Sequence, residues 1–175
     1  MKFARAIGSG LLGGVVAVVA VVAFCAGTWL LGADSDVGAL FGAPFMSGGG
    51  AVAWLIGCLV QLGVAAIVGV VYAAVFEWVT RRSGMLVGLL VAIPHVIVAG
   101  LAMGFLPMGS GDIGVGHPGA FLEYRGAMAI GVFVVAHLLY GITVGAAYGR
   151  PRHSVPAGPP LVWTDVSEAP REALE

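Results

Sequence analysis

Residues 126–149 read GAMAIGVFVVAHLLYGITVGAAYG and contain no Asp, Glu, Lys or Arg. An α-helix needs about 20 consecutive, mostly apolar residues to cross the hydrocarbon core of a bilayer. Backbone N–H and C=O groups find no water in that core, so a single spanning segment satisfies them by forming a helix. The stretch therefore predicts a membrane-spanning helix, and its one histidine, His137, needs an explanation.

The rest of the chain repeats this pattern. Of its 175 residues, 59% are hydrophobic and 10% are charged, and the mean hydropathy is +1.02. Soluble domains carry about 25% charged residues. We predict four spans, at Ala6–Leu31, Val52–Phe76, Met85–Leu106 and Ala127–Tyr148. The predicted fold class is an all-α membrane protein, with a bundle of four transmembrane helices over residues 1–149.

The basic residues predict the topology. All but Arg125 fall on one side of a four-span chain, namely Lys2, Arg5, Arg81, Arg82, Arg150, Arg152 and Arg171. Lys and Arg are enriched in cytoplasmic loops, so both termini are expected in the cytoplasm. The Gly-, Ala- and Val-rich composition is typical of a high-GC bacterium, so we expect the bacterial cytoplasmic (inner) membrane. The polar, proline-rich residues 150–175 predict a disordered cytoplasmic tail, and the net charge of −1 excludes a nucleic-acid partner.

The two halves of the predicted bundle resemble each other. When the chain is shifted by 76 residues, matching residues include Arg5 with Arg81, Gly8 with Gly84, Asp36 with Asp112, Gly69 with Gly145, and Tyr72 with Tyr148. An apolar bias would align some glycines by chance, but not Arg, Asp and Tyr in order. We predict a tandemly duplicated helical hairpin, with repeats at about 5–76 and 81–149 and a pseudo-twofold axis along the membrane normal.

Small residues recur at four-residue intervals within the spans. Gly10 and Gly14 show this spacing in the first span, and Gly141, Gly145 and Gly149 show it in the last. Such spacing lets the backbones of membrane helices approach closely. We therefore expect tight helix packing, either within the chain or in a homo-oligomer or larger membrane complex.

Two histidines are predicted to share one depth in the membrane. His95 follows Arg82 by 13 residues, and His137 precedes Arg150 by 13 residues. At about 1.5 Å per residue, both lie about 20 Å from the arginine side, near the midplane. Ionisable side chains at that depth usually face the bundle interior and indicate a functional site. The candidate midplane polar site comprises His95, His137, Gln61 and Tyr140.

Three interpretations of the midplane site are open. His95 and His137 could bind b-type haem or a metal ion through their ring nitrogens, although we expect no cofactor. They could instead line a proton-linked pathway with Gln61, Tyr140 and Thr143. The third interpretation, which we favour, is structural. Gln61 aligns with His137 in the repeat, and each would donate a hydrogen bond to a neighbouring helix, worth about 0.6–2 kcal/mol.

Candidate metal ligands also lie in the predicted outer loops. They are His117, Asp112, Asp36 and Glu123. Carboxylate and imidazole groups bind divalent cations, so these residues could form a site if the loops pack together. The residue types leave the identity of any metal open.

Other polar residues lie near the cytoplasmic ends of the spans. Glu77 and Arg81 have the i, i+4 spacing of a surface ion pair on a helix. Tyr72 and Tyr148 end their spans, as the aromatic residues that anchor helices at a membrane interface do. We predict a weak surface pair and two interfacial anchors.

A resemblance is carried by the last span and the loop before it, in the patterns His137-x-x-Tyr140-Gly141-x-x-x-Gly145-x-x-Tyr148-Gly149 and His117-Pro118-Gly119. These residues resemble small four-span bacterial and archaeal integral membrane proteins of unassigned function. The resemblance implies the topology and no activity.

The motifs of common enzyme classes are missing from the sequence. It has no phosphate-binding loop, dinucleotide fingerprint, HExxH or nucleophile motif. We therefore predict a non-enzymatic polytopic inner-membrane protein that serves as a packing or accessory component of a membrane assembly. The alternatives are a small proton-linked transporter or permeation unit that uses the midplane site, and a haem- or metal-binding redox protein.

Overall fold

The computed structural model describes residues 2–33, 37–42, 44–45, 50–105 and 118–151, and within these ranges it holds helices and loops but no strand. Four helices are long and apolar enough to cross a membrane, namely Ala4–Leu30, Gly50–Thr80, Met85–Met103 and Ala127–Tyr148. This confirms the prediction of an all-helical chain with four segments that are able to span a membrane. The tail from residue 152 lies outside the described residues.

The helix bounds differ in detail from the prediction. The spanning helices are α1 (Lys2–Leu30), α3 (Gly50–Ala74), α4 (Met85–Met103) and α5 (Ala127–Tyr148). The bounds of α5 are those predicted, whereas α3 continues as a π-helical segment, η1 (Val75–Thr80). Two short elements were not predicted. The helix α2 (Val37–Gly42) joins α1 to α3, and the 3₁₀ segment η2 (Ala120–Arg125) precedes α5.

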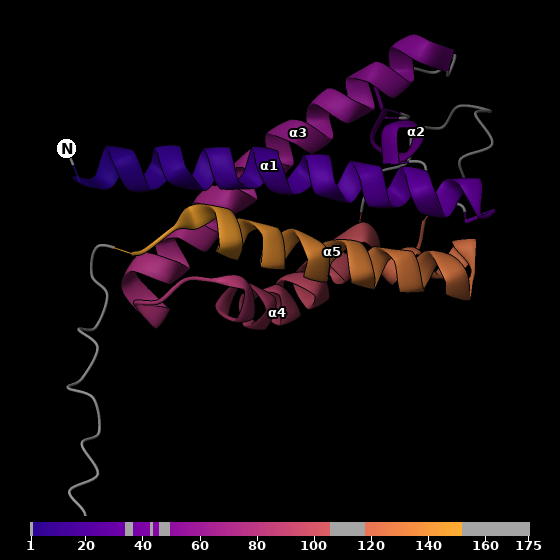
Figure 1. Ribbon diagram of the computed structural model, residues 1–175. Helices are drawn as coiled ribbons and strands as arrows, with labels where there is room; N and C mark the ends of the chain where they lie inside the picture. Colours follow the sequence, from indigo (N-terminus) through magenta and orange to yellow (C-terminus); the bar gives the residue numbers. More distant parts are fainter. Residues whose placement is uncertain (1, 34–36, 43, 46–49, 106–117, 152–175) are drawn as a thin grey trace, which may run out of the picture.

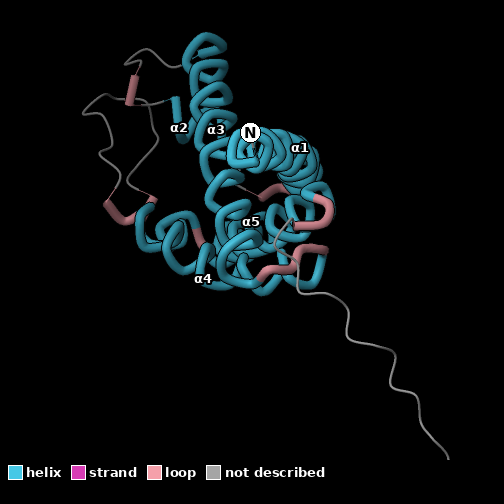
Figure 2. Tube along the Cα trace, turned by 90° about the vertical axis from the view of Figure 1, so that its left-hand side faces the viewer, coloured by secondary structure: helices cyan, strands magenta, loops and turns pink. Residues whose placement is uncertain are grey.

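The four long helices form an open bundle. In the order α3–α1–α5–α4, each helix packs along the next, and α2 packs on α3. Figure 1 shows α3 crossing α1 at an angle, so that the N-terminal half of α3 stands away from α4 and α5. The view in Figure 2 shows the same separation between α3 and α4. The bundle is therefore closed on three sides and open between α3 and α4.

Glycines make the crossing of α1 and α3 possible. A Cβ atom added to Gly10 would lie 2.8 Å from the carbonyl oxygen of Gly69. One added to Gly14 would overlap with the carbonyl oxygen of Ala65. Membrane helices gain dispersion energy from such close approach because lipid offers them no hydrophobic driving force for association. The predicted small-residue spacing is thus used inside the chain.

The crossing of α4 and α5 is built in the same way. Gly88 lies against the backbone of Gly141, and Gly145 lies against that of Gly84. The N–H of Gly84 donates to the carbonyl oxygen of Gly145 across 3.0 Å. In both hairpins, two small residues near the start of the first helix meet two small residues near the end of the second.

The contacts between the two hairpins are not symmetric. A pseudo-twofold axis would exchange α1 with α4 and α3 with α5, so α3 would pack on α4 as α1 packs on α5. Within the described residues α1 and α5 share a long interface, whereas α3 and α4 do not. The predicted twofold relation therefore does not extend to the packing of one hairpin on the other, and a cavity occupies the place of the missing interface.

An aromatic cluster fills the bundle near the C-terminal ends of α3 and α5. Phe76 and Val144 are fully buried there, and Tyr72 and Tyr148 are buried beside them. The ring centroids of Phe76 and Tyr148 are 5.2 Å apart, and those of Tyr72 and Phe76 are 5.9 Å apart. The prediction that both tyrosines are interfacial anchors is wrong, because their hydroxyl groups find partners inside the bundle.

Candidate functional site

A cavity of about 410 Å³ lies between α3 and α4. Side chains of α1, α2, α3, α4, η2 and α5 line it, and most of them are apolar. The polar groups on its wall include all four residues of the predicted midplane site, namely His95, His137, Gln61 and Tyr140. The tertiary structure thus brings these four residues to one cavity.

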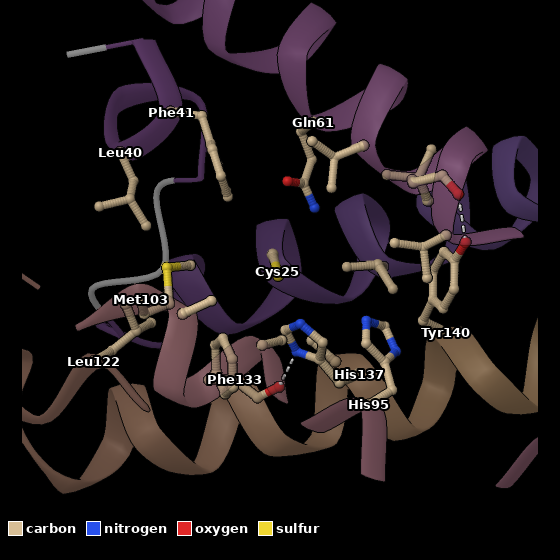
Figure 3. A pocket seen from close by; sticks show the side chains of 18 of the residues that line it. Cys25, Leu40, Phe41, Gln61, His95, Met103, Leu122, Phe133, His137 and Tyr140 are labelled. Atoms are coloured by element: carbon tan, nitrogen blue, oxygen red, sulfur yellow. Dashed lines mark hydrogen bonds between the residues drawn. The ribbon is translucent and has the colours of Figure 1, made fainter. Parts of the chain in front are cut away.

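The two histidines meet at the wall of this cavity. The imidazole centroids of His95, on α4, and His137, on α5, are 5.1 Å apart, with 69° between the ring planes. Figure 3 shows the rings side by side, with a nitrogen of each on the side where Gln61 and Cys25 lie. The equal depth predicted from their spacing to the arginines is what lets them touch.

His137 is held by its own helix. Its Nδ1 donates a hydrogen bond to the carbonyl oxygen of Phe133 across 2.8 Å. The Phe133 ring packs on the imidazole with centroids 4.1 Å apart. A carbonyl oxygen can only accept, so Nδ1 carries the proton. In the neutral imidazole, Nε2 of His137 is then a hydrogen-bond acceptor.

His95 is held by Tyr72, a residue that sequence reasoning did not assign to the site. The Tyr72 side chain is 1% exposed, and its hydroxyl lies 3.1 Å from Nδ1 of His95. Within the described residues His95 is the only hydrogen-bond partner of the Tyr72 hydroxyl. A buried hydroxyl needs an acceptor, so Tyr72 donates to Nδ1. Neutral His95 therefore carries its proton on Nε2, and the two histidines are opposite tautomers.

Tyr140 lies at one end of the cavity. Its hydroxyl donates to the carbonyl oxygen of Ala65 on α3 across 2.5 Å, which ties α5 to α3. Its ring lies 5.7 Å, centroid to centroid, from the rings of both Tyr72 and His95. The buried side chains of Phe76 and Val144 belong to the same core cluster as Tyr72 and Tyr140 and lie further toward the C-terminal ends of α3 and α5. The cavity is therefore closed toward the C-terminal ends of α3 and α5.

Gln61 faces the histidines from the opposite wall. Figure 3 shows its amide group pointing from α3 into the cavity. Its Oε1 atom is buried and accepts no hydrogen bond from the described residues. The structural interpretation predicted that Gln61 and His137 each bond a neighbouring helix. That prediction is wrong in the described residues, since His137 bonds its own helix and His95 makes the bond between helices.

The cavity opens sideways between α3 and α4. Val64 on α3 and Val98 on α4 both line it, and their side chains are 44% and 66% exposed. In a membrane an opening lined by such side chains faces lipid. Figure 3 shows Leu122 of η2 and Phe41 of α2 at the end of the cavity away from Tyr140, and Arg125 of η2 also belongs to the lining. The histidines can therefore be reached from the side of the bundle, through the opening between α3 and α4.

Most of the predicted outer-loop site lies outside the described residues. Asp36, Asp112 and His117 lie outside the described residues, and Glu123 is exposed on η2. Within the described ranges no group of three His, Cys, Asp or Glu side chains could hold a metal ion.

The geometry of the histidine pair bears on the haem interpretation. Bis-histidine ligation places the macrocycle between two imidazoles, with a ring nitrogen of each directed at the iron. Here the rings contact each other directly, with 5.1 Å between centroids, and their cavity-side nitrogens face the same space. A haem group would need the two side chains to separate, so this arrangement does not fit one.

Glu77 differs from its predicted role at the surface. It is 4% exposed within η1, and its Oε1 accepts a hydrogen bond from the Tyr148 hydroxyl across 3.0 Å. Arg81 follows η1 with a left-handed backbone (φ 51°) and is exposed. The π-helical turn changes the register after Ala74, so the predicted exposed i, i+4 pair is wrong. Glu77 instead joins α3 to α5.

Comparison with known proteins adds no family to these observations. No protein-family model, curated protein or solved structure matches the chain.

Proposed function

We propose that this chain is a non-enzymatic polytopic membrane protein that binds a small, mainly apolar molecule from the bilayer. The observation that carries the proposal is the cavity of about 410 Å³ between α3 and α4, which is open to the side and ends at a pair of histidines. Ligand pockets are typically concave and mostly apolar, with a few polar groups that fix orientation. This cavity has those properties.

A purely structural role explains the midplane residues less well. Polar side chains that serve only packing bond across helices, because unsatisfied groups are costly in hydrocarbon. Here Gln61 Oε1 is buried without such a bond in the described residues. The close α1–α3 and α4–α5 crossings already use many of the small residues, namely Gly10, Gly14, Gly69, Gly88, Gly141 and Gly145. These features favour a ligand over an accessory packing function.

The same cavity is the observation that favours the second candidate, a small proton-linked transporter that uses His95, His137 and Gln61. Transport needs an opening on the other side as well. Tyr140, Tyr72 and the buried side chains beneath them close that side in this conformation. Transport would therefore require α3 to separate from α5 at Tyr140.

The setting in the membrane is also part of the proposal. The arginine distribution supports cytoplasmic termini in a bacterial inner membrane, and the cavity then lies in the outer half of the bilayer. The similar glycine crossings of the two hairpins support a tandem duplication. An oligomer or a larger complex remains compatible with the exposed apolar surface of α1 and α3.

The test is a binding titration with the purified full chain in detergent micelles. Native mass spectrometry would count bound 1-dodecanol molecules per chain. We expect saturable binding of one molecule, weakened about tenfold by Ala102→Trp at the cavity opening. Ala146→Trp, on an exposed position of α5 outside the cavity lining, is the matched control. Binding that does not saturate, or that both variants weaken equally, would reject the proposal.

A further inference from the structure

The histidine pair offers one hydrogen-bond donor and one acceptor side by side. The Tyr72 hydroxyl occupies Nδ1 of His95, and the Phe133 carbonyl occupies Nδ1 of His137. The neutral rings therefore present an Nε2–H on His95 and an Nε2 lone pair on His137. Within the described residues neither Nε2 atom has a hydrogen-bond partner, and the rings do not bond each other.

We infer that the ligand of this cavity is a lipid-soluble alcohol whose hydroxyl group bridges the two rings. The hydroxyl oxygen accepts from Nε2–H of His95, and the hydroxyl proton is donated to Nε2 of His137. A hydroxyl group is both a donor and an acceptor, so it satisfies both rings at once. The inference rests on the proposed function, because it names the chemical class of the molecule that the cavity binds.

Other polar groups match the pair less well. An ether, ester or ketone oxygen can only accept, so it would bond His95 and leave the acceptor of His137 without a partner. A hydrocarbon would leave both nitrogens without a partner in apolar surroundings, where unpaired polar groups are costly. A charged group at the histidine pair would be surrounded by neutral side chains in hydrocarbon, where ionised groups are expensive.

The rest of the cavity suits a hydrocarbon chain. Apart from Gln61, Tyr140 and Arg125, the side chains that line it beyond the histidines are mainly apolar, such as Val21, Val68, Val98 and Phe133. The opening between α3 and α4 lets a chain longer than the cavity continue into lipid. The alcohol can therefore be a single-chain fatty or isoprenoid alcohol, or the free hydroxyl group of a diacylglycerol.

The test compares an alcohol with its methyl ether. Binding of 1-dodecanol and dodecyl methyl ether to the full chain in detergent would be measured by native mass spectrometry. We expect the alcohol to bind about tenfold more tightly, the ratio that corresponds to about 1.4 kcal/mol. A diacylglycerol and its methyl ether form a second pair, and the pair that binds more tightly identifies the source of the hydroxyl group.

A variant of His137 tests whether the acceptor nitrogen of that ring is responsible for the preference for an alcohol. His137→Phe removes the acceptor while retaining an aromatic ring, so the alcohol should lose its advantage while the ether still binds. Equal affinities of the alcohol and the ether for the wild-type chain would overturn the inference. This result is expected if a water molecule, rather than the ligand, bridges the two rings. It would leave the proposed function standing. Failure of both probes to bind would reject the proposed function as well.

Discussion

The hydroxyl group of Tyr72 on α3 lies 3.1 Å from Nδ1 of His95 on α4. Gly141 on α5 makes room for this contact, because a Cβ atom there would lie 2.9 Å from the Tyr72 oxygen. Three helices thus meet at one hydrogen bond. The bond sets the tautomer of His95 and marks the inner end of the cavity.

Removal of the Tyr72 hydroxyl should have two effects. Tyr72→Phe removes the only donor to Nδ1 of His95 in the described residues, and we expect a loss of stability of about 1 kcal/mol. His95 could then take either tautomer, so the preference for an alcohol over its methyl ether should fall. Thermal unfolding in detergent and the paired binding titration measure the two effects.

Tyr124→Phe provides the control for that experiment. Tyr124 is 73% exposed on η2 and lies outside the cavity lining, so loss of its hydroxyl should not change the alcohol preference. If Tyr72→Phe kept the full alcohol preference, Tyr72 would not set the tautomer of His95.

Added methyl groups should have opposite effects at two glycines. Gly88→Ala places a Cβ atom against the backbone of Gly141 and 3.0 Å from the Cα of Gly145, so α4 and α5 must separate. We expect a loss of about 2 kcal/mol. Gly131→Ala on α5 meets nothing within 4 Å and should stabilise the helix by up to about 1 kcal/mol.

Unfolding of both glycine variants in the same detergent would measure these changes. Equal changes of the same sign would show that helix propensity, rather than close backbone approach, decides the effect of glycine in this chain.

Glu77 should stabilise the bundle through its contact with Tyr148. Glu77→Ala leaves the buried Tyr148 hydroxyl without this acceptor, and we expect a cost of about 1–3 kcal/mol. Glu77→Gln keeps a carbonyl oxygen at the same place and should retain most of the stability. Arg81→Ala, at an exposed position, should have little effect. A large loss from Arg81→Ala would instead support the surface ion pair.

The histidine geometry also makes a spectroscopic prediction. Because the His95 and His137 rings contact each other, the purified chain should show no Soret absorption band after haem supplementation. A Soret band that was present in the wild type and lost in both His95→Ala and His137→Ala would contradict this expectation. It would also show that the two side chains can separate to hold a macrocycle.

Several residues show how far the sequence could predict the site. The depths of His95 and His137 follow from helical rise and from their spacing to the arginines, so their meeting could be anticipated. Tyr72 could not be assigned to them, because its position at the end of a span is equally typical of an interfacial anchor. The direction of its ring depends on the space left by Gly141 on another helix. The burial of Glu77 depends likewise on the π-helical turn.

The sequence by itself determined that this chain is all-helical, with four apolar helices and two histidines at one level. These properties follow from composition and from the rise per residue within a single helix. In lipid the backbone of each such helix must satisfy its own hydrogen bonds, whatever its neighbours are. Only the tertiary structure decided that α1 packs on α5 while α3 stands apart from α4. The reason is that helix packing depends on which side-chain shapes meet across the bundle. The separation of α3 from α4 leaves the cavity, and with it the cavity-side nitrogens of His95 and His137, open to a ligand.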